Sequence, residues 1–493
     1  MLFPTTDFAV FFVVVFTASW LLRPYPGAWK WMILFASYVF YGWWDWRFVA
    51  LLAASTVITQ TGALAAARAR PRKAALAVTV ALQLGLLGWF KYYGFFTVNV
   101  ANALHRVGIG SPLPVVQVAL PIGISFFTFM GISYVVDCHR GQLEPAGWLD
   151  AAVYLAFFPH LVAGPIVRGS ELLPQLRPRA LTTADRRIDA SRAAWLIMAG
   201  LAKKVVISSF LARVIVDPVF ALPGHHSALE VLVAVYAYAI QIYADFSGYT
   251  DIAIGVALLL GFRFPENFDS PYAAVSMQDF WRRWHITLSR WLRDYLYIPL
   301  GGNRGSRWTT VRNIMITMAI GGLWHGAAWT FVLWGVFHGV TQSVGMLRRR
   351  YAGVARPDPG ATAPSTSTGQ VAVLERVKLV ARPQSSPWVA RLVTFHLVCL
   401  GWVLFRAESI GSAVRLLSRL AHPGPSPLVT PLVVLAIAGS LASQYVPRDA
   451  VSRLQTRFSA MGVAAQGAVL AGGLFTITLL GPTGVAPFIY YRF

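Results

Sequence analysis

Twelve runs of mostly apolar residues, each near or beyond the length that crosses a bilayer, recur along the 493-residue chain. A membrane-spanning helix needs about 20 such residues. The predicted spans are residues 7–22, 31–46, 48–67, 75–97, 115–136, 149–167, 194–217, 228–260, 311–345, 389–405, 427–445 and 464–486. Only 13% of the residues are charged, whereas a soluble domain has about 25%. The sequence therefore excludes a soluble enzyme and predicts an all-α, polytopic membrane protein with about 10–12 membrane helices.

The apolar runs also suggest how the chain is divided. Residues 228–260 and 311–345 exceed one crossing, so each is expected to hold a long tilted helix or a helix with a re-entrant piece. Residues 351–388 are rich in Pro, Ser, Thr and Gly, which predicts a flexible, cytoplasmic linker. This linker separates a membrane core, residues 1–350, from C-terminal membrane helices, residues 389–493.

The positive charge follows the membrane topology. The chain has 42 Lys and Arg against 20 Asp and Glu, a formal charge of +22. In a soluble protein this excess would suggest nucleic acid, but here the basic residues lie in short clusters between apolar runs, as the positive-inside rule predicts. The expected partner is the lipid bilayer, with no nucleic acid. Arg23 and Lys30 follow the first run and no basic residue precedes it, so the N-terminus is predicted to face outward.

Few patterns point to chemistry with a bound cofactor. The two cysteines, Cys138 and Cys399, give neither a disulfide framework nor a metal-binding spacing, and no metal site is predicted. The sequence has no G-x-S-x-G elbow, no P-loop and no HExxH motif. Classical serine hydrolases, NTP-driven pumps and zinc proteases therefore have no support.

Polar residues inside apolar runs are costly in a membrane and are functional candidates. His325 lies among Gly321, Gly322 and Gly326 and follows Trp324. Glycines there would let a backbone or substrate approach closely, and a neutral histidine in a dry pocket suits a general base. The alternative is a core histidine with an interhelical hydrogen bond, and this segment alone leaves both open.

A second histidine, His338, follows 13 residues later. On a continuous helix the two rings would lie roughly 140° apart, so a shared metal is improbable and a packing role is expected for His338. Asp245 and Asp251, with Lys203 and Lys204, could form a proton or substrate relay. That relay would suit a transporter, which is the rival function class.

His285 lies in the segment WRRWHITLSRWLRDY, beside Trp281, Arg282 and Arg283. This composition is typical of an interfacial amphipathic helix, with arginines at the headgroups and tryptophans in the aromatic belt. A basic, aromatic surface could equally hold a phosphate-bearing cofactor. Composition alone does not separate these uses.

Several segments together carry a resemblance to a known family. They include ASYVFYGWWDWRF (36–48), GWFKYYGFF (88–96), LPIGISFFTFMGISYVVDCHRG (120–141), AFFPHLVAGPIVR (156–168), YADFSGYTDIAIG (243–255), GFRFPENFDSPY (261–272), DFWRRWHITLSRWLRDYLYIPLGGNR (279–304) and GGLWHGAAWTFVLWGVFHG (321–339). In this order they cover most of residues 1–410. The chain resembles the membrane-bound O-acyltransferase family, in particular the bacterial branch that O-acetylates exported polysaccharides such as alginate.

The resemblance implies a many-helix acyltransferase around a central tunnel, in a bacterial inner membrane. It implies His325 as the catalytic histidine and His285 as its assistant, with contacts to the acyl donor from Trp281, Arg282, Arg283 and Trp324. The donor would be acetyl-CoA or a related cytoplasmic acyl thioester, with no tightly bound cofactor. An extracytoplasmic partner would relay the acyl group to the polysaccharide.

Other functions stay open at this point. The same fold could transfer D-alanyl groups or acylate peptidoglycan. The chain could also be a transporter, or a scaffold subunit that recruits a soluble acetyltransferase. The scaffold predicts that both histidines can be replaced without loss of activity.

Overall fold

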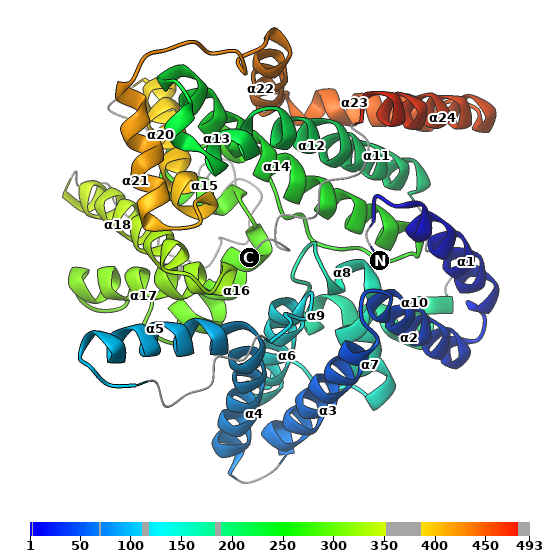
Figure 1. Ribbon diagram of the computed structural model, residues 1–493. Helices are drawn as coiled ribbons and strands as arrows, with labels where there is room; N and C mark the ends of the chain where they lie inside the picture. The colour runs from blue at the N-terminus through cyan, green and yellow to red at the C-terminus, as the bar shows by residue number, and fades with distance from the viewer. Residues whose placement is uncertain (2, 69–70, 111–117, 183–188, 352–385, 482–493) are drawn as a thin grey trace, which may run out of the picture.

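A computed structural model describes residues 1–493 apart from 2, 69–70, 111–117, 183–188, 352–385 and 482–493. Every long regular element within this described part is a helix, and none of its residues forms a strand (Figure 1). Six helical stretches are long and apolar enough to cross a membrane, and three shorter apolar helices accompany them. The predicted all-α, polytopic fold is therefore confirmed. The long stretches are Arg47–Arg68, Arg72–Arg106, Ala190–Ala221, Ala228–Leu259, Pro387–Arg406 and Val463–Leu480.

The N-terminal third begins with consecutive helices, of which the stretches Arg47–Arg68 and Arg72–Arg106 are long enough to cross a membrane. The helices are α1 (Thr6–Leu22), α2 (Pro26–Gly42), α3 (Arg47–Arg68), α4 (Arg72–Leu87), the π-helical turn η1 (Gly88–Tyr92), α5 (Tyr93–Arg106) and α6 (Ile124–His139). Local residues determine where these helices begin. The Thr5 side chain accepts a hydrogen bond from the Phe8 amide at 3.3 Å. Pro26 occupies the first turn of α2, where a backbone N–H would have no partner within the helix, so its absence costs nothing. The predicted spans 7–22, 31–46, 48–67 and 75–97 overlap α1, α2, α3 and the α4–η1–α5 stretch. The predicted span 115–136 begins outside the described residues, and its part from Ile124 onward lies in α6.

The predicted span at residues 149–167 is instead broken. It contains α7 (Trp148–Ala156) and α8 (Phe158–Leu161), followed by irregular chain in which Gly164 has a φ of 122°. Pro159 and Pro165 interrupt the apolar run, since proline removes a helical hydrogen bond. The segment is nonetheless buried, so its apolar composition reflects packing inside the protein rather than a single crossing.

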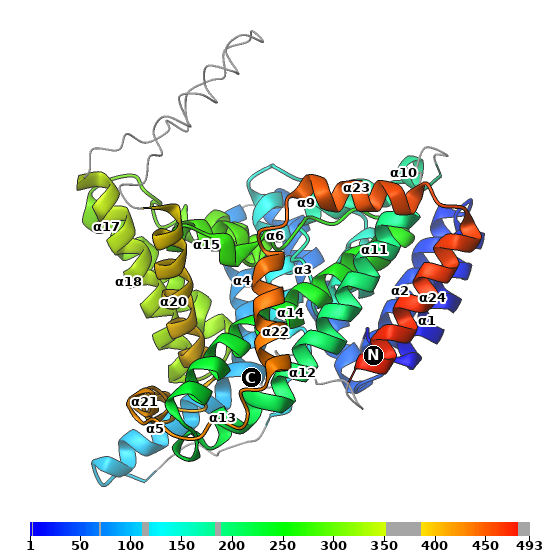
Figure 2. The same cartoon turned by 90° about the horizontal axis from the view of Figure 1, so that it is seen from above.

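The middle of the chain surrounds one long helix. The short elements α9 (Gly169–Leu172), η2 (Leu173–Leu176) and α10 (Pro178–Thr182) come first. The long stretch Ala190–Ala221 follows, made of α11 (Ala190–Leu201), η3 (Ala202–Ser208), α12 (Ser209–Leu211), η4 (Ala212–Val216) and α13 (Asp217–Ala221). The turn η5 (Pro223–His225) then leads to the long helix. The long run at 228–260 is a single continuous helix, α14 (Ala228–Leu259), which Ser227 and Glu230 start with a capping box. In both views α14 lies between α1–α2 on one side and α17–α20 on the other (Figure 1, Figure 2).

The other long run, 311–345, is not one long helix. It forms two helices, α17 (Arg307–His325) and α18 (Trp329–Tyr351), joined by residues 326–328. The two pack closely, because a Cβ on Gly322 would lie 2.2 Å from the Phe331 carbonyl oxygen and one on Gly335 equally near that of Met318. Glycine permits this backbone approach.

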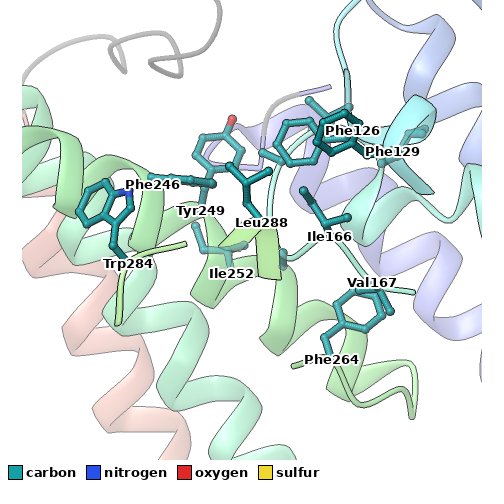
Figure 3. Close-up of a cluster of buried hydrophobic side chains, with 14 of the residues drawn as sticks. Phe126, Phe129, Ile166, Val167, Phe246, Tyr249, Ile252, Phe264, Trp284 and Leu288 are labelled. Carbon is teal, nitrogen blue, oxygen red and sulfur yellow. The ribbon is translucent and has the colours of Figure 1, made fainter. Parts of the chain in front are cut away.

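The predicted interfacial helix around His285 is also two short helices. They are α15 (Met277–Arg283) and α16 (Ile286–Leu292), preceded by η6 (Pro271–Ala273) and followed by η7 (Arg293–Tyr297). Figure 3 shows Leu288 of α16 packed in one apolar cluster with Phe246 of α14 and Phe129 of α6. Much of this segment is therefore buried inside the protein, although Arg282 and Arg293 are exposed.

The C-terminal region has α20 (Pro387–Arg406), α21 (Ile410–Ser418), η8 (Arg419–Ala421), α22 (Pro431–Ser443), α23 (Arg448–Ser459) and α24 (Val463–Leu480). Most of the predicted linker 351–388 lies outside the described residues. Helix α20 packs against α14 and α18, so it is part of the same helical body as the core.

Candidate active site

His325 is the last residue of α17 and is only 3% exposed. Three aromatic rings from three helices surround it: Trp324 at 5.0 Å between ring centroids, Trp334 of α18 at 5.0 Å and Phe405 of α20 at 5.2 Å. The sequence predicted this histidine in a dry setting, and the structure places it in one. Phe405 comes from beyond the predicted linker, so the C-terminal helices help to build the site.

The glycines around His325 serve helix packing. A Cβ on Gly326 would lie 2.1 Å from the Phe331 ring, and Gly322 meets the backbone of α18 as described above. Of the two uses predicted for these glycines, close approach of another backbone is the one seen. Their effect is to hold the end of α17 against α18.

His285 is fully buried and lies at the junction of α15 and α16, with a φ of 42°. Left-handed backbone at a non-glycine residue is uncommon and costs free energy, and it occurs often at functional sites. The His285 Nδ1 lies 3.2 Å from the Asn267 Oδ1. This oxygen also accepts hydrogen bonds from the Thr287 amide at 3.1 Å and hydroxyl at 2.8 Å.

These contacts fix which nitrogen of His285 carries the proton. Because Thr287 donates to the Asn267 Oδ1, that atom is an acceptor, so Nδ1 of His285 must be the donor. In the neutral ring, Nε2 then has the free lone pair. The Nε2 atom is buried and has no hydrogen-bond partner among the described residues. The hydrogen-bond acceptor of the His285 ring in this tautomer, Nε2, thus lies inside the protein.

Trp324 brings the two histidines together. Its indole lies 6.1 Å from the His285 ring and 5.0 Å from the His325 ring, between centroids. Phe129 stacks on Trp324 at 5.3 Å and on Trp291 at 3.7 Å. His285 and His325, the two predicted histidines, therefore both contact the tightly packed Trp324 ring.

The residues predicted to contact an acyl donor separate into two groups. Trp281 and Trp324 are buried among aromatic rings. The Arg282 side chain is exposed, whereas Arg283 forms an ion pair with Asp279 at 3.0 Å. Of these four residues, Arg282 is thus the cation most accessible to an anionic substrate.

His338 lies closer to the site than its spacing predicted. It belongs to α18, so the helical angle from His325 does not apply. Its ring is 4.7 Å from that of Trp334, which also contacts His325. A Cβ on Gly401 would lie 2.8 Å from the His338 Nε2. Neither ring nitrogen of His338 has a hydrogen-bond partner within the described chain.

Sequence reasoning missed Asn267 and Lys91. Asn267 follows a proline–glutamate pair in a polar stretch, and nothing in its spacing from His285 indicates contact. Lys91 donates to the carbonyl oxygens of Trp324 at 2.6 Å and His325 at 3.2 Å. A lysine within the apolar run GWFKYYGFF was the available signal, since such residues are functional candidates by default.

The charges predicted for a transporter relay pair with each other. Lys203 bonds Asp251, and Lys204 bonds Asp245, linking η3 to α14. Paired charges can be accommodated in an apolar interior without any transport role. Over the described chain, no group of three or more His, Cys, Asp and Glu residues is placed to hold a metal ion.

Comparison with known proteins identifies the family. The family model for MBOAT, the membrane-bound O-acyltransferase family, matches residues 124–353. The chain is 38% identical to the probable alginate O-acetylase AlgI of Azotobacter vinelandii, over 84% of this chain and 77% of that protein. It is 35% identical to the peptidoglycan O-acetyltransferase of Helicobacter pylori, over 78% and 72% respectively. It is 27% identical to the teichoic acid D-alanyltransferase of Bacillus subtilis, over 58% and 69%. The chain is therefore an acyltransferase that belongs to the membrane-bound O-acyltransferase family.

Proposed function

We propose that this protein moves an acetyl group from a cytoplasmic acyl thioester toward hydroxyls of an exported cell-surface polysaccharide, with alginate as the first candidate. The convergence of His325 and His285 on the Trp324 ring, inside a buried aromatic cluster, carries the proposal. The similarity to alginate O-acetylases over most of the chain supports the choice of acceptor. We take acetyl-CoA or a related thioester as the donor substrate, with no tightly bound cofactor.

The proposed reaction is acyl transfer assisted by a general base. The acceptor oxygen attacks the thioester carbonyl carbon while His325 takes the hydroxyl proton. The new C–O ester bond forms as the C–S bond breaks, and the imidazolium returns the proton to the leaving thiolate. General-base assistance contributes roughly 10²–10⁴-fold, and positioning in a water-poor site contributes much of the remainder.

In this proposal His285 orients a reactant. Its Nδ1–H is held by Asn267, so the bare Nε2 can accept a hydrogen bond from an N–H or O–H of a substrate. The left-handed backbone at His285 and the three contacts to the Asn267 oxygen hold the ring in place. Such pre-organisation favours a fixed geometry for the reacting groups.

We place the protein in a bacterial inner membrane with its N-terminus outward, because the basic clusters lie between the apolar runs as the positive-inside rule requires. The donor would then approach from the basic, cytoplasmic side, where the exposed Arg282 can contact an anionic carrier. Arg283 suits that role less, since Asp279 already pairs with it. An extracytoplasmic partner would relay the acetyl group to the polysaccharide.

Peptidoglycan O-acetylation is the second candidate, favoured by the 35% identity to the Helicobacter pylori enzyme. It uses the same chemistry on a different acceptor, as D-alanyl transfer uses a different acyl group. Mass analysis of the alginate, the peptidoglycan and the teichoic acid of cells with and without this protein separates these candidates.

The test of the catalytic assignment is His325→Ala in cells. We expect the O-acetyl content of the exported polysaccharide to fall at least about 100-fold, measured by mass spectrometry, with the protein still inserted in the membrane. The matched control is His396→Ala in α20, because His396 contacts Tyr236 rather than the aromatic cluster. Unchanged O-acetylation in both His325→Ala and His285→Ala would favour a scaffold subunit instead.

A further inference from the structure

The carbonyl end of α17 needs hydrogen-bond donors, because the last four carbonyls of any helix lack partners within it. Helix α17 ends at the buried His325, and the next residue, Gly326, continues in extended conformation with a φ of −160°. The donors come from another part of the chain. Tyr92 donates to the Leu323 carbonyl at 2.8 Å, and Lys91 donates to those of Trp324 at 2.6 Å and His325 at 3.2 Å.

The local structure of η1 brings both donors to one place. Lys91 and Tyr92 are consecutive residues at the end of a π-helical turn, Gly88–Tyr92, within the membrane-length stretch Arg72–Arg106. Such π turns inside longer helices are frequent at functional sites. A third hydrogen bond runs from the Lys91 ammonium to the Ser125 hydroxyl at 3.3 Å. The three N–H groups of Lys91 therefore have three acceptors, two of them at the end of α17.

Lys91 is half-buried, and it differs from the buried lysines Lys30 and Lys204 in the charge it meets. Lys30 pairs with Asp150 and Lys204 with Asp245. No carboxylate of the described chain lies within ion-pair distance of Lys91. An ammonium without an anion is costly inside a membrane, but the carbonyl end of a helix carries partial negative charge that favours a cation. The positive charge of Lys91 is thus directed at the end of the helix that bears His325.

We propose that Lys91 is a positioning residue for the acyl transfer: it caps α17, holds His325 in place and, in its protonated form, sets a positive charge beside the imidazole. This inference rests on the proposed function. Since like charges repel, the ammonium disfavours a protonated His325 in the resting enzyme and so keeps the ring ready to accept a proton. A positive charge there also favours the negative charge that develops on the thioester oxygen during attack.

The other ionisable groups near His325 belong to two further elements. They are His285, at the start of α16, and His338, on α18. Phe405, from α20, is uncharged. Lys91 is therefore the one amine among the described groups that act on this ring, and its removal is expected to change the pH dependence of the reaction.

The experiment uses purified full-length protein in detergent, with acetyl-CoA as the donor probe, an alginate oligosaccharide as the hydroxyl acceptor and free-thiol release as the readout across roughly pH 5.5 to 8.5, where histidine titrates. For Lys91→Met we expect a rate loss of about 10- to 100-fold at neutral pH, and an acid limb of the pH–rate profile that moves up by about one unit. Lys91→Arg keeps the charge and should keep the acid limb. Tyr92→Phe removes one capping bond only. It should lower the rate less than Lys91→Met does, and it should leave the acid limb of the pH–rate profile unchanged.

Each result bears on the proposal separately from the proposed function. Thiol release that depends on His325, together with an unchanged rate and acid limb in Lys91→Met, would overturn the positioning role alone. Thiol release that does not need His325 would overturn the proposed function and this inference with it. If Lys91→Met does not accumulate, Lys91→Gln decides, because it keeps an N–H donor but not the charge: the same upward shift supports the proposal, and an unshifted limb refutes it.

Discussion

Helices α14 and α24 are both long and apolar enough to cross a membrane, yet their surroundings are opposite. In α14, 72% of the apolar stretch is buried inside the protein, and in α24 none of it is. In a membrane, lipid covers what protein does not. Apolar composition therefore predicts that both helices span the membrane, but it does not show which of them lies in the interior of the protein.

Their polar residues do distinguish the two helices. In α14, Asp245 and Asp251 bond lysines from η3. In α24, the hydroxyls of Thr476 and Thr478 donate to carbonyls one turn earlier in the same helix. A helix that faces lipid must satisfy its polar atoms internally, whereas a helix in the protein interior can take partners from its neighbours. Side chains that require outside partners thus identify the structural centre.

The largest expected effect comes from breaking the buried pair in α14. Asp245→Leu leaves the Lys204 ammonium buried without its anion, and the side chains of this pair are 1% and 3% exposed. Losing one partner of such a pair costs about 3–5 kcal/mol. We expect the variant to accumulate poorly and to melt far below wild type, as measured by thermal unfolding in detergent.

The double variant Lys204→Met/Asp245→Leu and the α24 variant Thr476→Val are the controls. The double variant should recover most of the stability, because replacing both charges by apolar groups removes the uncompensated ion. Thr476→Val should stay close to wild type. A stable Asp245→Leu would mean that the pair is not what sets α14 apart from α24.

A smaller effect is expected from adding one methyl group to each helix. A Cβ on Gly248 would lie 2.7 Å from the Gly200 carbonyl oxygen, where α14 and α11 cross, and such overpacking costs about 1–3 kcal/mol. In α24, a Cβ on Gly472 would meet nothing within 4 Å. Gly248→Ala should therefore lower the melting temperature by several degrees, while Gly472→Ala leaves it unchanged or slightly raised. Equal shifts in both variants would contradict the close helix crossing.

The sequence predicted the spans well where an apolar run is continuous, as in α1 and α3. It did not place the break within 311–345, because residues 326–328 are Gly-Ala-Ala and are as apolar as the helices they join. It misread 149–167 for the opposite reason, since a buried irregular segment needs the same side chains as a span. Pattern alone does not separate burial in lipid from burial in protein.

The site was predicted in part for a related reason. His325 and His285 stand out because a polar residue in an apolar run carries its own signal. Asn267, Lys91 and the position of His338 depend on contacts between elements distant in the sequence. The pairing of Asn267 with His285 spans 18 residues and a chain reversal, and that of Lys91 with His325 spans 234. Contacts between residues so far apart in the sequence cannot be predicted from hydrophobic periodicity.

The smallest effect is expected at the pair of Arg168 with Asp294 in η7, at 2.8 Å, where the side chains are 14% and 18% exposed. Burial alone would raise the pKa of Asp294, but hydrogen bonds and charge from Arg293 and Arg168 hold that pKa below its ordinary value. A lowered pKa means that the pair stabilises the fold above the unfolded-state value of about 3.9 and that this contribution disappears as pH falls through the folded value. Asp294→Asn should therefore lose about 1 kcal/mol at neutral pH.

This loss should stay constant down to about pH 5 and shrink below it, in thermal unfolding followed across pH. Asp449→Asn in α23 is the control, because Asp449 is exposed and forms no ion pair with a described residue. A loss for Asp294→Asn that grows as the solution becomes more acidic would reverse the expected sign. A loss as large as that of Asp245→Leu would show that burial of the pair does not set its contribution, and the contrast between the interior of α14 and the periphery would fail.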